Sequence, residues 1–507
     1  MDALPDDVVA KVVMASVPSA PMKQRFRTAM LFARTSKRMF RVVTCLCPDL
    51  WESLLVKGTT PASVRQLRFV TKYVVPHTVR RLRSLWMTTH DTWAVLGDFL
   101  QKHPATLERL EIGIDRQLWP TSTWTEHLSR LSEVRDLRII FYRDRATNNY
   151  ADVALPSMRK LTSMILEFDE GTVTPLLAIL ATPQPALCQL NIRANGYVSE
   201  QPSLWPSLVH HTRLQTLRLQ LGPADGAQIL DDAACPGAAG HLHSVTHVDI
   251  EFRYVHPSAY AFLTHCTALR DLHMVNGGIF APTSPVLPCL PPTLTSLSLE
   301  RVRLDAECTT LSALTELRDL RLADCFDVYT LRGLAPLKHL TTMDIEDKMS
   351  LRCLDGLGRC TSLVSLRCTA LNVEECGDFA MLQGLRVCVM KTKYLSRCLL
   401  PWNVPSFTRS LRTLHVDVWT CTHLSMDVPG VFPALRRLLM NGSNKEGAAW
   451  LLESAAVSGS PLLRLEWPCD PGVRFGVQYP RAAQLLVDWM DRMSASDADA
   501  DAHVEAY

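Results

Sequence analysis

The residues LTSLSL at Leu294–Leu299 recur three times further along the chain. They return as LRDLRL at Leu317–Leu322, LTTMDI at Leu340–Ile345 and LVSLRC at Leu363–Cys368. The stretches begin at residues 294, 317, 340 and 363, so the period is 23 residues. Because alternate side chains of a strand point to opposite faces, the fourth and sixth residues of each stretch face inward. The residue that opens each stretch lies just ahead of the strand and turns in to join them.

A fixed period of this size marks a solenoid, and LxxLxL at this period is the leucine-rich-repeat signature. One repeat cannot bury its inward side chains alone, whereas stacked neighbours share a continuous core. A single match would favour an ordinary alternating strand or a leucine-rich helix, but four matches in one register favour the repeat. The sequence therefore predicts an α/β leucine-rich-repeat solenoid, a curved horseshoe with parallel strands on its concave face.

Similar stretches predict an array of about sixteen repeats over residues 81–467, with starts 22 residues apart at 363 and 385 and 31 apart at 214 and 245. The predicted starts are Leu82, Leu107, Val134, Leu161, Leu187, Leu214, Val245, Leu269, Leu294, Leu317, Leu340, Leu363, Leu385, Leu411, Leu435 and Leu462. Longer repeats have room for outer helices, such as Thr92–Lys102 and Ala448–Ala456. In the 23-residue repeats, leucines at every third position, as at Leu331 and Leu334, predict a tight 3₁₀-like outer segment.

The segments around the array divide the rest of the chain. We expect a helical domain at residues 1–55, a connecting or capping segment at 56–80 and a carboxyl-terminal cap with a helix at 468–493. The last segment, SASDADADAHVEAY at 494–507, is small and acidic, which predicts a disordered tail.

Composition excludes several classes of function. The 507 residues carry 53 Lys and Arg against 51 Asp and Glu, a formal net charge of +2, so we expect no nucleic-acid partner. The sequence contains no run of about eighteen apolar residues, so we expect no membrane span. The start, MDALPDDVVAKVV, is acidic where a secretory signal would be basic. The 16 cysteines lack paired CxxC spacing, which favours reduced thiols in the cytosol or nucleus and predicts neither a metal nor a cofactor.

The first 55 residues predict three short helices. The first places Leu4, Val8 and Val12 along one face, with Pro5 in its first turn. The others fit Phe26–Ala33 and Ser36–Cys45, and the stretch PDLWESL follows at Pro48–Leu54.

This order of blocks resembles an F-box, the small helical domain that docks on the Skp-type adaptor of a cullin–RING ubiquitin ligase. F-box domains followed by leucine-rich repeats are a known pairing, so the resemblance implies a Skp-type adaptor and a cullin as partners. The adaptor contacts that it implies are Leu4, Pro5, Val8, Val12, Leu31, Phe32, Ser36, Met39, Leu50 and Trp51. The alternative is a helical cap that only shields the first repeat, because solenoids need such caps.

The third and fifth residues of each repeat, and the residue just after LxxLxL, are predicted to point to solvent on the strand side. This places an acidic group at Asp249, Glu251 and Asp271, with His247 and His273 beside it. Further along the array, Arg321, Asp344 and Arg367 take the fifth position, as Trp86 does in the first predicted repeat. The mixed signs predict a surface that binds a target protein through His247, Asp249, Glu251, Asp271, His273, Arg321, Asp344 and Arg367.

No P-loop, GxSxG, HExxH or kinase motif occurs in the chain, so we expect no catalytic residues. The sequence thus predicts the substrate-recognition subunit of an SCF-type ubiquitin ligase. The alternative is a repeat scaffold or regulator with no ubiquitin role.

Overall fold

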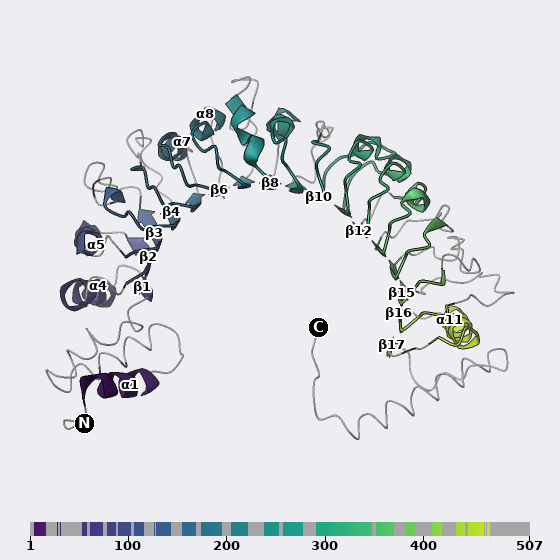
Figure 1. Ribbon diagram of the computed structural model, residues 1–507, viewed down its shortest axis with the longest axis horizontal. Helices are drawn as coiled ribbons and strands as arrows, with labels where there is room; N and C mark the ends of the chain where they lie inside the picture. The colour runs from purple at the N-terminus through teal and green to yellow at the C-terminus, as the bar shows by residue number, and fades with distance from the viewer. Residues whose placement is uncertain are drawn as a thin grey trace. The chain divides into compact units, whose positions relative to one another are not determined.

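The computed structural model describes residues 5–16, 28, 31, 53–57, 61–74, 79–87, 90–102, 106–115, 126, 128–142, 155–168, 174–194, 204–221, 238–252, 257–276, 290–346, 351–369, 381–391, 408–417, 432–441, 445–460, 462 and 464–466. The chain forms two compact units, Met1–Leu269 and Arg270–Tyr507. In each unit, the strands line one side, and the helices and 3₁₀ segments that connect them line the other (Figure 1).

The first unit contains a parallel sheet in which every strand from β1 to β8 pairs with the next along the chain. The strands are β1 (Ser53–Lys57), β2 (Arg81–Met87), β3 (Arg109–Asp115), β4 (Asp136–Tyr142), β5 (Ser163–Phe168), β6 (Gln189–Ala194), β7 (Thr216–Leu221) and β8 (His247–Phe252). The helices of this unit are α1 (Asp6–Ser16), α4 (Pro61–Tyr73), α5 (His90–Lys102), α7 (Thr174–Ala181) and α8 (Trp205–Leu208), with 3₁₀ helices η5 (Ala238–Ser244) and η6 (Pro257–His265).

The second unit repeats this plan with shorter outer segments. Its parallel strands are β9 (Asp271–Asn276), β10 (Ser296–Glu300), β11 (Asp319–Ala323), β12 (Thr342–Glu346), β13 (Ser365–Cys368), β14 (Val387–Met390), β15 (Thr413–Asp417), β16 (Arg437–Asn441) and β17 (Arg464–Glu466). Between them lie the 3₁₀ helices η7 (Thr309–Leu311), η8 (Arg332–Leu334) and η9 (Leu357–Arg359), and the helix α11 (Lys445–Val457).

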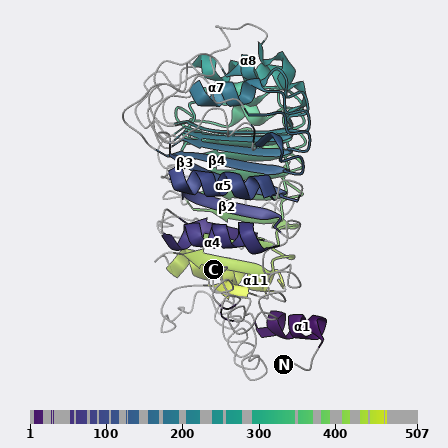
Figure 2. The same ribbon diagram turned by 90° about the vertical axis from the view of Figure 1, so that its left-hand side faces the viewer.

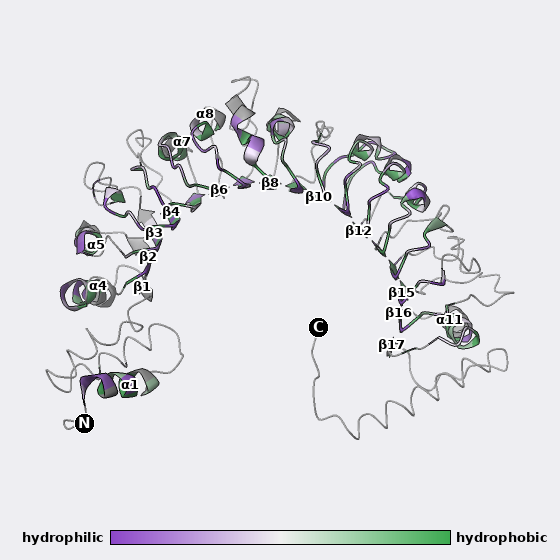
Figure 3. Cartoon of the chain, in the orientation of Figure 1, coloured by the Kyte–Doolittle hydropathy of each residue, from purple (hydrophilic) through white to green (hydrophobic). Residues whose placement is uncertain are grey.

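The strand register confirms the repeat. Leu297 pairs with Leu320, and the same position continues to Met343 and Leu366, so partners are 23 residues apart in sequence. All four side chains are at most 2% exposed. Figure 3 shows both hydrophilic and hydrophobic residues on the strands, and burial alternates along β5 and β8, as a half-buried strand requires. The fold of both units is therefore a leucine-rich-repeat solenoid, while the predicted horseshoe curvature of the whole chain stays a prediction.

The first predicted start is wrong by three residues, whereas the later starts from Leu107 to Leu462 agree with the pairing. Leu82 pairs with Leu110, the fourth residue of the repeat that Leu107 opens. Val79 therefore opens the earlier repeat, and its fifth position is Arg83 rather than Trp86. The stretch VRRLRSLW holds two overlapping patterns, and the register of β2 shifts between Ser84 and Met87.

The sheet also begins earlier than the predicted array at residue 81. Strand β1 pairs with β2 through Leu54 and Leu82, and α4 follows it. The segment predicted as a connector at 56–80 thus contains the end of a strand and a helix. The strand SLLVK carries adjacent rather than alternating apolar residues, which hid it from a search for LxxLxL.

The outer segments named in the prediction are confirmed, although the 31-residue repeat that begins at Leu214 holds the 3₁₀ helix η5. Long repeats hold α5 and α11, and Figure 2 shows α4 and α5 running over neighbouring strands of the first unit. The 23-residue repeats hold η7, η8 and η9 instead, with Leu331 and Leu334 fully buried. There the chain passes so close that a Cβ on Gly333 would lie 2.4 Å from the carbonyl carbon of Cys308.

Polar residues three places before the opening leucine are buried and reach the backbone of the preceding repeat. The Gln184 amide donates to the carbonyl of Pro156 at 3.0 Å and accepts the Met158 N–H at 2.8 Å. His211 Nε2 lies 2.9 Å from the carbonyl oxygen of Leu180. These contacts satisfy polar groups that would otherwise be costly inside the core.

The first predicted helix is present as α1, but its buried face differs from the expected one. Val9 and Val13 are at most 1% exposed, whereas Val12 is half-buried and Pro5 is exposed. Leu4 and the side chain of Val8 lie outside the described residues, as do Phe32, Ser36, Met39, Leu50 and Trp51. The predicted cap at 468–493 and the tail at 494–507 also lie outside them.

Candidate functional site

The strand face, formed by the third, fifth and seventh residues of each repeat, is the surface that the repeats build most regularly. Side chains at these positions alternate with buried ones, as in the half-buried and buried residues of β5 and β8. Parallel pairing places equivalent residues of neighbouring strands next to each other, about 4.8 Å apart. The face is therefore a grid in which each side chain meets its counterparts from the adjacent repeats.

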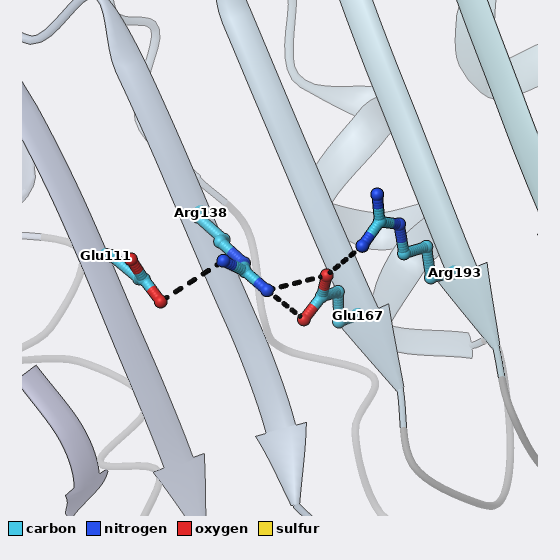
Figure 4. A network of polar contacts seen from close by, with 4 residues as sticks. All are labelled: Glu111, Arg138, Glu167 and Arg193. Carbon is cyan, nitrogen blue, oxygen red and sulfur yellow. Dashed lines mark hydrogen bonds and ion pairs between the residues drawn. The ribbon is translucent and has the colours of Figure 1, made fainter. Parts of the chain in front are cut away.

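In the first unit this face carries a chain of alternating charges (Figure 4). Arg138 Nη2 donates to both carboxylate oxygens of Glu167, at 2.9 and 2.8 Å. Its Nη1 lies 3.3 Å from Glu111 Oε1, and Arg193 Nη1 lies 3.1 Å from Glu167 Oε1. The residues come from four consecutive strands, β3 to β6.

Burial makes this network firmer than a surface ion pair. The side chains of Glu111 and Glu167 are each 14% exposed, and that of Arg138 is 31% exposed. Exposed pairs contribute about 0–1 kcal/mol, whereas charge-assisted bonds in a shielded position are stronger. The network fixes a polar patch on the face with its charges turned mainly toward one another.

The prediction that fifth-position residues point to solvent covers Glu111 and Arg138, but the sequence analysis did not single out Glu167 and Arg193. The latter two occupy the seventh position, just after LxxLxL. The signal that could have identified them is the opposite charge of residues that stacking places next to each other in neighbouring repeats.

The predicted acidic group is divided between the two units. His247, Asp249 and Glu251 lie on β8 of the first unit, and Asp271 and His273 lie on β9 of the second. The grouping of the two sets stays a prediction. Within the first unit, Arg218 Nε lies 3.7 Å from Asp249 Oδ2, and Thr246 Oγ1 lies 2.7 Å from His247 Nδ1.

The structure brings Arg321, Asp344 and Arg367 together on β11, β12 and β13. Arg321 pairs in register with Asp344, which pairs with Arg367. Partial burial raises the pKa of Asp344 above its usual value, although Arg367 and Arg321 oppose this shift. Arg321 Nη2 also lies 3.8 Å from Glu346 Oε2. The three side chains form a mixed-charge patch on the strand face of the second unit.

The described thiols are mostly buried and chemically quiet. Burial raises the pKa of Cys266, Cys360 and Cys388 to about 12 in each case. A thiol with so high a pKa holds little thiolate at neutral pH and is a poor nucleophile.

The described part of the chain contains neither a metal-ligand cluster nor a membrane-spanning helix. No group of three or more His, Cys, Asp or Glu residues within it could hold a metal ion. No helix within it is both long and apolar enough to cross a membrane.

Comparison with known proteins adds no family assignment. No family model matches the chain, and no curated protein matches it. An internalin of Listeria monocytogenes is similar in structure, with a TM-score of 0.41, 15% identity and coverage of 68% of this chain and 89% of that one. A leucine-rich-repeat protein of Leptospira interrogans gives a TM-score of 0.39, 15% identity and coverage of 81% and 87%. The assignment of the fold therefore rests on the register and burial of the repeats themselves.

Proposed function

We propose that this chain is the substrate-recognition subunit of an SCF-type cullin–RING ubiquitin ligase. In this proposal the amino-terminal helical region binds a Skp-type adaptor, and the strand face binds a target protein. The chain performs no covalent step. It contributes by holding a target lysine near the ubiquitin-loaded enzyme, which is catalysis by proximity.

The observation that carries the proposal is the set of apolar residues left accessible at the predicted adaptor contacts. Leu31 is 65% exposed, Val12 is half-buried and Pro5 is exposed. Apolar side chains that stay accessible in the folded chain are available to a partner. The resemblance to an F-box assigns these residues to the adaptor.

The strand face supplies the second half of the proposal. Its paired charges at Arg321, Asp344 and Arg367 offer donors and acceptors to the polar groups of a target protein. His247, Asp249, Glu251, Asp271 and His273 complete the set of target contacts that we propose.

One observation favours the alternative, a scaffold or regulator whose amino-terminal helix only caps the repeats. Val9 and Val13 are at most 1% exposed, so α1 already buries one face. A cap needs such a face and no adaptor.

Co-purification with a Skp-type adaptor separates the two functions. We expect the full chain to retain the adaptor and Leu31→Asp to reduce retention at least tenfold, because a charge on an exposed contact disrupts binding but not a core. Lys11→Ala, on the exposed side of α1, is the matched control and should retain the adaptor. A well-folded wild-type chain that retains no adaptor would sink the ligase function and leave the scaffold.

A further inference from the structure

Three arginines form a continuous column along one edge of the strand face in the second unit. They are Arg386, Arg412 and Arg436, each at the second position of its repeat. The N–H of Arg412 donates to the carbonyl of Arg386 at 2.8 Å, and the N–H of Arg436 donates to the carbonyl of Arg412 at 2.8 Å. The three side chains are all exposed. At about 4.8 Å per strand, they concentrate positive charge within about 10 Å.

In the first unit, charged residues near the start of neighbouring repeats form ion pairs of opposite sign. Arg80 lies 3.9 Å from Glu108, Arg109 lies 2.9 Å from Asp136, and Lys160 lies 2.7 Å from Glu133. Opposite signs thus meet between neighbouring repeats at these positions, although Arg81 and Arg109 also pair in register there. Like charges on neighbouring strands are destabilising, so the arginine column carries a cost that these ion pairs avoid.

The described residues around the column contain few carboxylates. Residues 381–391, 408–417 and 432–441 include one acidic residue, Asp417 at the far end of β15, against Lys391, Arg409 and Arg437. The column therefore retains its charge for an external anion.

Apolar side chains lie beside the column. Val364, which precedes Arg386 in the same backbone ladder, is 36% exposed, and the N–H of Arg386 donates to its carbonyl at 2.8 Å. Val387 and Val389 on β14 and Leu439 on β16 are half-buried on the strand face. The surface thus combines guanidinium groups with aliphatic contacts.

Arginines beside aliphatic residues suit an acidic peptide better than a single strand of nucleic acid. Proteins that bind single strands of nucleic acid stack bases on aromatic side chains. The described side chains of β13 to β16 include no exposed Phe, Tyr or Trp. Arginine binds carboxylates through its planar fork of donors, and aliphatic residues accept apolar side chains.

We propose that Arg386, Arg412 and Arg436, with Val387 and Val389 beside them, bind an acidic peptide segment of a partner protein. Asp and Glu of the peptide pair with the arginine column, and an interspersed apolar residue packs on the valines. This proposal rests on the protein-binding function proposed above but not on the adaptor. The partner segment that it specifies is acidic, with an interspersed apolar residue.

Fluorescence anisotropy tests the proposal on the full chain with a short labelled peptide in which Asp and Glu alternate with Leu and Ser. We expect R386Q/R412Q/R436Q to weaken binding roughly tenfold, because three exposed ion pairs are lost. The control R135Q/R270Q/R318Q removes the same charge from exposed second positions that do not adjoin one another, and it should leave affinity within about twofold. Circular dichroism checks the folding of both variants.

Several results would overturn the proposal. They are equal weakening by both triple variants, tighter binding of a single-stranded oligonucleotide of equal charge, and no binding of the peptide. Binding only when Asp497, Asp499 and Asp501 are changed to Asn would make this chain's own acidic segment the occupant. Adaptor retention measured in the same samples separates the two proposals, since its loss with intact peptide binding refutes only the ligase function.

Discussion

Arg138 holds both carboxylate oxygens of Glu167 through one nitrogen, Nη2, at 2.9 and 2.8 Å. Its other terminal nitrogen lies 3.3 Å from Glu111. A single guanidinium thus bridges two shielded carboxylates from the strands on either side. The stability of the strand face in the first unit depends on this residue more than on its more exposed neighbours.

Replacing Arg138 with Gln should therefore destabilise the first unit by about 1–3 kcal/mol, because both carboxylates lose a charged partner. The measurement is urea unfolding followed by circular dichroism. Arg218→Gln is the control, since Arg218 and Asp249 are 57% and 41% exposed and 3.7 Å apart. Its effect should stay below about 1 kcal/mol. Equal effects of the two changes would show that burial adds nothing to the network.

Gly333→Ala should destabilise the second unit by about 1–3 kcal/mol or more, the usual result of overpacking. The new methyl group would lie 2.4 Å from the Cys308 carbonyl carbon and 2.5 Å from the Thr309 nitrogen, and backbone cannot rotate away. Gly384→Ala is the matched control, because its nearest neighbour would be the Leu363 carbonyl oxygen at 3.6 Å. Thermal unfolding of both variants gives the comparison. A wild-type melting temperature for Gly333→Ala would refute the close approach.

Asp305→Ala should destabilise the second unit by about 0.5–2 kcal/mol, the range for losing a capping side chain. The carboxylate accepts the N–H groups of Thr309 at 2.7 Å and Thr310 at 2.9 Å, ahead of η7. Partial burial alone would raise the pKa of Asp305, but these hydrogen bonds outweigh it and lower the pKa to about 2.

The sign of the pH dependence follows from that lowered pKa. The stabilisation by Asp305 is fully present above its ordinary pKa of 3.8 and is lost as the pH falls toward about 2. The stability difference between wild type and Asp305→Ala should shrink over the same window, as urea unfolding at a series of pH values would show. Asp319→Ala, an exposed residue on β11, controls for the loss of one negative charge. A difference that persists at pH 2 would contradict the assignment.

His211→Gln should flatten the acid sensitivity of the first unit. Burial lowers the pKa of His211 below 6.5, although its hydrogen bond to Leu180 opposes the shift. The unfolded chain therefore binds a proton more readily, so stability present above pH 6.5 is lost as the pH falls below it. Gln can still donate to the Leu180 carbonyl, whose oxygen lies 2.9 Å from His211 Nε2. Melting temperatures measured at pH 7.5 and 5.5 should differ less in the variant than in wild type.

The neighbouring His210 is the control for this prediction. It is exposed, and its charge makes the smallest contribution to the lowered pKa of His211, so His210→Gln should change the pH dependence much less than His211→Gln does. A wild-type pH dependence in His211→Gln would place the acid sensitivity elsewhere in the chain.

Sequence reasoning predicted the repeat, its register and the 3₁₀ outer segments because one fixed period constrains all of them. Leucines such as Leu331 and Leu334 are buried at the positions that the period predicts. The beginning of the sheet was harder to predict. In β1 the strand SLLVK lacks alternation, and around Leu82 two overlapping patterns compete, so only backbone pairing distinguishes them.

The candidate site was less predictable, because a single repeat does not show which charges are already paired. Arg138 and Arg386 both appear in the sequence as arginines at outward positions. The first is held by Glu111 and Glu167 from adjacent strands, whereas the second stands beside Arg412. The difference depends on neighbours more than twenty residues away, which only the stacking of repeats brings into contact.

The ladder through Val364, Arg386, Arg412 and Arg436 is made of main-chain N–H and carbonyl groups, while its side chains point into solvent. A substitution at one of these positions changes the charge of the surface without altering a hydrogen bond of the ladder. The residues that hold the fold together are therefore different from the residues that would select a partner. Point mutations at second positions offer an evolutionary route to new partners, one repeat at a time, with the buried leucines unchanged.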